Sequence, residues 1–285
     1  MIDVAVRILL YGAVIGGIWA LVASGFSLIF GVARILNFAH GIFFILAAYI
    51  GIVLIQSGIN SYLSTFAGIV IVGGFAVGIY LGLLSKIKDH EVMVIIVTLA
   101  IALLVEQILI LIFGEHGLSY PDFISGVVRI GMTPITYDRI VAFVVAIVVL
   151  TLLEVFIHKT NTGKMILASS QNYEGALLVG IDVDRIFVIT MFLSAVLAGV
   201  GGVLYGQVFA VSPAVSLKAL IFAFAIVILG GLGSIKGSIV AAFIIGYITT
   251  IANQFLGAQW SEFTALLIII AILVIKPTGL FGVEE

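Results

Sequence analysis

Long, uninterrupted runs of apolar residues constrain this chain more than any other feature of its sequence. The run LLYGAVIGGIWALVASGFSLIF (9–30) contains no charged residue. About 20 apolar residues are enough for a helix to cross the ~30 Å hydrocarbon core of a bilayer. The runs are continuous rather than alternating, and backbone groups in lipid must pair within their own segment, so helices are expected. The sequence therefore predicts an all-α, polytopic membrane protein.

Composition supports this prediction and narrows the function. The chain has 285 residues, of which 63% are hydrophobic and 9% are charged. A soluble domain carries roughly 25% charged residues, so most of this surface must face lipid. The net charge of −2 gives no electrostatic reason to expect nucleic acid. With no cysteine, the chain has no disulfides, thiol catalysis or thiolate metal sites.

We predict one permease-like domain, residues 1–285, with eight or nine membrane helices. The first run is longer than a signal-peptide core and begins with Asp3 and Arg7, so it is expected to be a retained span. The second and seventh spans adjoin Gly-rich turns and are candidates for broken or re-entrant segments. The predicted spans are 8–30, 37–56, 62–85, 91–113, 139–157, 186–209, 218–234, 238–256 and 260–276.

The distribution of Lys and Arg predicts the orientation. With nine spans, one set of loops holds eight of the 12 cations and the other set holds four. Loops rich in Lys and Arg stay in the cytoplasm, so the N-terminus is expected outside and the C-terminus inside. The eight on the expected cytoplasmic side are Arg34, Lys86, Lys88, Lys159, Lys164, Arg185, Lys236 and Lys276. Glycines four residues apart, such as Gly12/Gly16, Gly74/Gly78/Gly82 and Gly202/Gly206, predict close helix packing and a second membrane subunit.

No motif for enzymatic chemistry or ATP binding is present. The sequence lacks a Walker A pattern and an H-E-x-x-H motif, and its four histidines are spread over different expected loops. No cofactor, no metal site and no enzymatic activity are therefore expected, and transport remains. Glu106 is the one ionisable residue well inside a predicted span, and with Gln107 it is a pathway candidate. Lys218 and Glu262 are expected near span ends, where long side chains reach the membrane surface at little cost.

One polar stretch interrupts the apolar runs: HKTNTGKMILASSQNYEGALLVGIDVDR (158–185). Within it, residues 165–181 are expected to form a short helix with apolar ends, a polar centre and Gly180 as its stop. Helices that lie on lipid are usually rich in Lys and Arg, whereas this segment has none. A groove on a partner protein suits it better than a lipid surface, although a juxtamembrane loop is the alternative.

Four ordered stretches resemble the ABC importer permeases of the branched-chain amino acid type, and more closely the LivH-like than the LivM-like subunit. They are NYEGALLVGIDVDR (172–185), GVARILNFAHGIFFILAAYIG (31–51), LSAVLAGVGGVLYG (193–206) and LKALIFAFAIVILGGLGSIKGSIVAAFIIG (217–246). The resemblance covers nearly the whole chain. It implies a type II-like importer permease of an amino acid or small amide substrate.

The resemblance also implies partners and functional residues. The partners are a second, LivM-like permease subunit, two cytoplasmic ATPases and an extracytoplasmic substrate-binding protein. A cytoplasmic coupling helix over about 164–181 would contact the ATPases, and the extracytoplasmic loop 114–138 would meet the binding protein. The expected ATPase contacts are Gln171, Asn172, Glu174, Ala176 and Gly180. Further pathway or gate candidates are Asn37, His40, Asn253 and Gln254.

Each of these candidates also has a structural interpretation. Asn37 is a suitable helix N-cap, and Asn253 with Gln254 would equally form a hydrogen bond between helices. Ile42 and Lys236 stand where the family often has an acidic residue and a proline, so a permease for urea or short amides is an alternative. The alternatives from other classes are a gradient-driven secondary carrier and a scaffold subunit without its own pathway.

Overall fold

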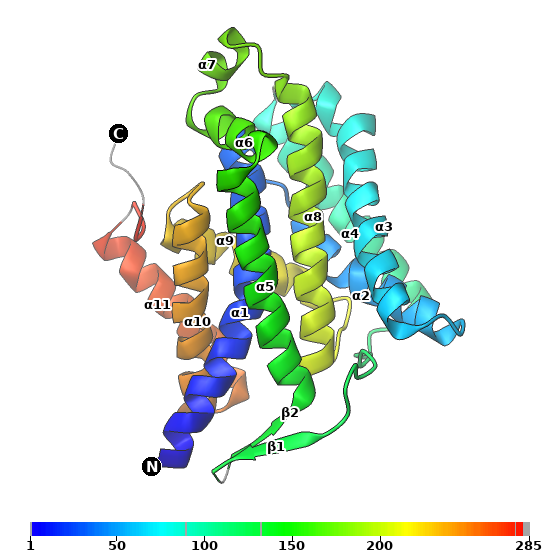
Figure 1. Cartoon of the computed structure of the whole chain (residues 1–285), viewed down its shortest axis with the longest axis vertical. Helices are drawn as coiled ribbons and strands as arrows, with labels where there is room; N and C mark the ends of the chain where they lie inside the picture. Colours follow the sequence, from blue (N-terminus) through cyan, green and yellow to red (C-terminus); the bar gives the residue numbers. More distant parts are fainter. Residues whose placement is uncertain (1, 89, 132, 277, 282–285) are drawn as a thin grey trace.

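The computed structural model describes residues 2–88, 90–131, 133–276 and 278–281. It is a helical bundle with one small hairpin at one end (Figure 1). The elements are α1 (Ile2–Ala33), α2 (His40–Gln56), α3 (Ser61–Gly82), the 3-10 turn η1 (Leu84–Lys86), α4 (Glu91–Phe113), β1 (Val127–Ile130), β2 (Thr133–Thr136), α5 (Tyr137–Lys159), α6 (Asn161–Gln171), α7 (Tyr173–Leu178), α8 (Val183–Val208), α9 (Val215–Gly230), α10 (Ile235–Leu256) and α11 (Ala258–Ile275).

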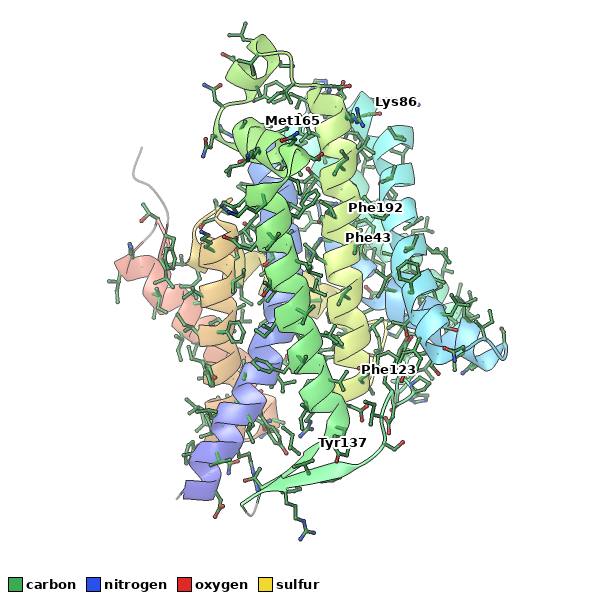
Figure 2. All side chains as sticks on the ribbon, in the orientation of Figure 1. Phe43, Lys86, Phe123, Tyr137, Met165 and Phe192 are labelled. Carbon is green, nitrogen blue, oxygen red and sulfur yellow. The ribbon has the colours of Figure 1, made fainter. Side chains whose placement is uncertain are left out.

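All nine predicted spans coincide with helices, which confirms the all-α polytopic fold. Seven of the described helices are long and apolar enough to cross a bilayer, and α2 and α9 are shorter. The loop 114–138 contains the antiparallel hairpin of β1 and β2. We call this the hairpin end of the bundle and the opposite end the α6 end. Figure 2 shows Phe123 and Tyr137 at the former and Met165 and Lys86 at the latter.

The bundle is built around α1 and α8. In the most apolar window of each helix, α1 is 83% buried and α8 is 72% buried, whereas α4 and α11 are 11% and 17% buried. The outer helices therefore present most of their surface to lipid or to another protein. Polar side chains on those outer helices need an explanation, because lipid offers them no hydrogen-bond partner.

Glycines set the closest helix contacts. A Cβ atom at Gly202 of α8 would overlap the carbonyl of Phe44 in α2, and one at Gly246 of α10 would overlap the backbone of Gly16 in α1. These positions follow the expectation for small residues in membrane bundles. The α3 glycines do not follow this expectation. A Cβ atom at Gly74, Gly78 or Gly82 would meet nothing within 4 Å, so these glycines do not pack against this chain.

The helices α2 and α9 are each shorter than the ~30 Å hydrocarbon core of a bilayer. Their 17 and 16 residues correspond to about 24–26 Å at 1.5 Å per residue. The chain returns into the bundle through 34–39 before α2 and through 209–214 before α9. The two first turns then meet, since a Cβ at Gly41 would overlap the carbonyl of Ser216.

Contacts with α1 show how deep these first turns lie. Nε2 of His40 is 2.9 Å from the carbonyl oxygen of Val22, which lies roughly 16 Å along α1 from its end at Ala33. Helix α2 then runs to the hairpin end, where Tyr62 at the start of α3 stacks on Phe123. Helix α9 runs the other way, and Gly233 just beyond it lies beside Gly31. The two segments thus have opposite directions, an arrangement that recurs in transporters built from inverted repeats.

Candidate pathway and docking surface

The predicted single helix over 165–181 is wrong in one respect, because the segment forms two helices, α6 and α7. The break falls at Asn172, whose backbone is extended (φ −149°, ψ 100°). Its side-chain oxygen accepts the N–H of Gly175 at 2.8 Å and so caps α7, as asparagine does at helix starts. Gly180 follows α7 at φ 81°, the left-handed conformation that commonly ends a helix.

Most of the expected ATPase contacts lie on an exposed tip. Gln171, Asn172, Glu174 and Gly180 are exposed. Ala176 is 3% exposed and supports α7 from beneath, so it does not belong to the outer surface as expected. The tip gains an apolar patch that the prediction omitted, since Leu178 and Val179 are 89% and 77% exposed.

This tip is joined to the bundle through α8. The ring of Tyr173 stacks on that of Phe187, with centroids 6.3 Å apart. Lys88, in the connection between α3 and α4, forms an ion pair with Asp184 at 2.5 Å. Residues Phe187 and Asp184 both belong to the first turns of α8. Displacement of α7 would therefore act on the helix that packs against α1, α2 and α3.

The two gate candidates at the start of α2 are packed into the core. Asn37 and His40 are 1% and 0% exposed. Asn37 accepts the N–H of Ala39 at 3.0 Å, so it caps the turn that leads into α2 rather than α2 itself, which begins at His40. His40 contacts the hydroxyl of Ser194 at 3.3 Å as well as Val22. The expectation that histidines occupy loops is wrong here, because the break before α2 carries His40 to the middle of the bundle.

Helix α4 provides polar partners for both broken segments. Its Thr98 accepts the N–H of Phe38 at 3.1 Å. Two turns further on, Glu106 accepts the hydroxyl of Ser216, in the first turn of α9, at 2.5 Å. A carboxylate at this place also suits the positive end of a helix dipole. The neighbouring Gln107 is exposed, although most of α4 is apolar.

Lys218 and Glu262, which were expected near span ends, do lie in the first two turns of α9 and α11, but α9 begins inside the bundle. Nζ of Lys218 in α9 and a carboxylate oxygen of Glu262 in α11 form a salt bridge. The ring of Phe222, one turn after Lys218, stacks on the ring of Trp19 near the middle of α1, with centroids 4.9 Å apart. The first turn of α9 therefore lies within the bundle rather than at its end.

A cavity of about 240 Å³ opens beside this ion pair. Trp19, Tyr205, Phe209 and Phe222 form its aromatic wall, and Thr249, Asn253 and Ser261 supply polar groups. Lys218 also lies 6.0 Å from the centre of the Tyr205 ring. A mostly apolar cavity with a few convergent polar groups is typical of a small-molecule site.

Asn253 borders a second cavity as well. It lines both the Lys218 cavity and a neighbouring cavity of about 130 Å³, which also contains Tyr11, Arg139 and Thr250. The guanidinium of Arg139 lies 4.3 Å from the centre of the Tyr11 ring, near the hairpin end. Asn253 is exposed, whereas Gln254 is half-buried and does not line either cavity.

The loop before the hairpin is fastened to the break that precedes α9. Leu118 and Val211 exchange two backbone hydrogen bonds of 2.8 Å each. Tyr120 is buried, and its hydroxyl lies 2.6 Å from that of Thr65. Burial raises the pKa of the Tyr120 phenol, so the group stays protonated at neutral pH. Because Leu118 is bonded to Val211, movement of this loop would also move residues 209–214 and the first turn of α9.

The sequence analysis placed Lys218 and Glu262 near span ends and did not include them among the site candidates, and it did not identify the aromatic wall. One signal was available, because residues 215–230 are too few to cross a bilayer. A lysine in the first turn of such a helix must lie at depth unless the helix begins at a membrane surface. Glu262 gave no equivalent signal, because α11 is long enough to place it near a membrane surface.

Together, the seven long apolar helices among the described residues, the two shorter ones α2 and α9, and the polar cavities are the features of a polytopic membrane permease. Residues 8–274 match the family described as branched-chain amino acid transport system / permease component, and the chain belongs to this family. The members are transport permeases rather than enzymes. Family membership also implies ATPase and binding-protein partners of an ABC importer.

Curated relatives of nearly the same length agree with this assignment. The chain is 26% identical to the high-affinity branched-chain amino acid transport system permease protein LivH of Salmonella typhimurium, over 96% of this chain and 94% of the relative. It is 29% identical to a probable branched-chain amino acid transport permease protein LivH of Methanocaldococcus jannaschii, over 99% and 94%. A fructose import permease protein, FruG of Bifidobacterium longum, is 25% identical over 81% and 71%. No solved structure matches the chain.

Proposed function

We propose that this permease subunit moves branched-chain amino acids or related small amino acids inward across the cytoplasmic membrane. The observation that carries the proposal is the family match over 8–274, together with relatives named for this substrate class. The Lys218–Glu262 cavity supports it, because one cation, one anion and an apolar wall complement an amino acid zwitterion better than a neutral sugar or amide.

The α6–α7 tip is the proposed docking surface for one of the two ATPases, and the other would dock on the second permease subunit. Its apolar patch offers contacts of the kind found at the centres of protein interfaces, and Glu174 offers a charged contact of the kind found at their rims. The stack of Tyr173 on Phe187 would pass movement of the ATPases to α8. The second permease subunit is proposed to cover the exposed polar residues at membrane depth, Gln107 and Asn253, so that the pathway lies between the two subunits.

A substrate-binding protein is proposed to dock at the hairpin end. The hairpin is held to the start of α1, since the hydroxyl of Thr133 donates to the carbonyl of Asp3 at 3.2 Å. The preceding loop is held to Val211. Docking on residues 114–138 would therefore be transmitted to α1 and to the break before α9.

The coupling role is tested in the complex reconstituted with its partner subunits. Leu178→Asp and Glu174→Arg should lower ATP hydrolysis stimulated by leucine and the binding protein about tenfold or more, because one decade corresponds to ~1.4 kcal/mol. Lys86→Glu, a charge reversal at an exposed site of the same end, is the matched control and should retain stimulation. Full stimulation of both tip variants in an assembled complex would contradict docking at α7.

The proposed orientation places the α6 end in the cytoplasm and the N-terminus outside. The chain contains no cysteine, so a single introduced thiol reports its own accessibility. Ser170→Cys should react with a membrane-impermeant maleimide only in inverted vesicles. Reaction in intact cells would reverse the orientation.

A further inference from the structure

We propose that the Lys218–Glu262 ion pair is a transient substrate station, which opens so that Lys218 binds the carboxylate and Glu262 the ammonium of a single amino acid. This inference deepens the proposed function and rests on it. An ionisable pair at membrane depth is costly to place there and by default marks a substrate route. Here the pair adjoins a cavity rather than filling a sealed core.

The pair remains accessible, which distinguishes it from a buried structural bridge. The side chains of Lys218 and Glu262 retain 28% and 48% of their exposure. Both line the cavity together with Asn253, which also lines the Arg139 cavity nearer the hairpin end. A solute that enters from the hairpin end would thus pass Asn253 before it reaches the ion pair.

The dimensions and the wall suit one amino acid of moderate size. A cavity of about 240 Å³ holds about eight waters at ~30 Å³ each, a space comparable with one leucine. The stacked rings of Trp19 and Phe222 provide an apolar surface for the substrate side chain. Once the α-groups replace the ion pair, Lys218 and Glu262 each keep a partner of opposite charge, so entry leaves no unpaired charge.

The same arrangement explains release. When the substrate leaves, Lys218 and Glu262 close on each other again, which competes with rebinding. A pathway needs such sites, because binding must be favourable enough for entry and weak enough for exit. The half-crossing helix α9 bears the lysine and is attached through Val211 to the outer loop, so movements of that loop would change the distance between the two charges.

The test is leucine uptake by the complete complex in proteoliposomes with an unchanged binding protein. Lys218→Met and Glu262→Gln should each lower uptake about tenfold or more, since each leaves one substrate charge without a partner. The charge-swapped variant, Lys218→Glu with Glu262→Lys, restores an ion pair but inverts its polarity against the aromatic wall. It should match the wild type in thermal stability but not in uptake. Lys236→Met, which removes an exposed ion pair with Glu154, should transport normally.

Two results would overturn the substrate station. Normal uptake by both single variants would show that the charges are not used, and recovery of uptake by the swapped variant would show that the pair only braces α9 against α11. Failure of the proposed function itself gives a different pattern: the wild-type complex, tested on a panel of amino acids, would take up none of them. Reduced uptake with normal melting in the single variants, and no rescue by the swap, supports the station.

Discussion

Helices α2 and α9 are nearly equal in length and both begin partway across the membrane, but their first turns have different surroundings. The first turn of α2 is closed: His40 is 0% exposed and is held by Val22 and Ser194. The first turn of α9 faces a cavity and carries Lys218. Two helices of similar length thus have different roles: α2 is a fixed support, and α9 borders a solute-accessible space.

This difference follows from what packs against each helix. Helix α2 lies against α8, where Gly202 allows the backbone of Phe44 to approach closely, and no charged residue occurs along its length. Helix α9 borders α11, which is largely unburied within this chain. We expect substitutions near α2 to damage folding and substitutions near the first turn of α9 to damage transport.

The largest effect is expected at Gly202. In Gly202→Val, the new side chain collides with the carbonyl of Phe44, and a backbone carbonyl cannot move aside as a flexible side chain can. The cost should exceed the ~1–3 kcal/mol typical of overpacking, so little monodisperse protein should be recovered by size-exclusion chromatography. Gly78→Val in α3, with no neighbour within 4 Å, is the matched control. Normal recovery of the Gly202 variant would mean that α2 and α8 are not closely packed.

An intermediate effect is expected at Glu106. Glu106→Leu removes the acceptor for Ser216 and should lower the free energy of unfolding by about 1–2 kcal/mol, the upper range for hydrogen bonds between membrane helices. Glu106→Gln keeps an acceptor and should cost less. Thermal melting in detergent measures both, and Gln107→Leu at the exposed neighbour is the control. A stable Glu106→Leu variant that has lost uptake would instead make Glu106 part of the pathway.

The sequence was sufficient to predict the helices but not their depths. Apolar runs reveal each span because the bilayer requires them, so all nine helices could be located. Hydropathy gives the length of an apolar run but not the depth at which its helix begins in the bundle. The depths of His40 and Lys218 were therefore not predicted: His40 was expected in a loop and Lys218 near a span end. Both positions depend on the breaks 34–39 and 209–214, whose path into the bundle is decided by packing against α1, α4 and α8.

The candidate site shows the same limit. Glu174 and Gly180 stood out because charge and glycine interrupt an apolar chain, and both lie at the exposed tip. The break at Asn172 depends on a side-chain cap to Gly175, which competes locally with a continuous helix. Lys218 and Glu262 are 44 positions apart in the sequence, and no local sequence pattern predicts a contact between them.

The smallest effect on stability, and the sharpest contrast between the two first turns, is expected from single cysteines. Asn253→Cys changes an exposed residue beside the α9 cavity and should alter the free energy of unfolding by no more than ~0.5 kcal/mol. Ser194→Cys places a thiol of similar size beside His40, where the exposed fraction is 0%. A small, membrane-impermeant methanethiosulfonate added outside should modify the first thiol and spare the second, and added leucine with the binding protein should slow the first reaction. Equal modification of both thiols would mean that α2 also borders solvent, and the division between a fixed half-helix and a solute-facing one would no longer hold.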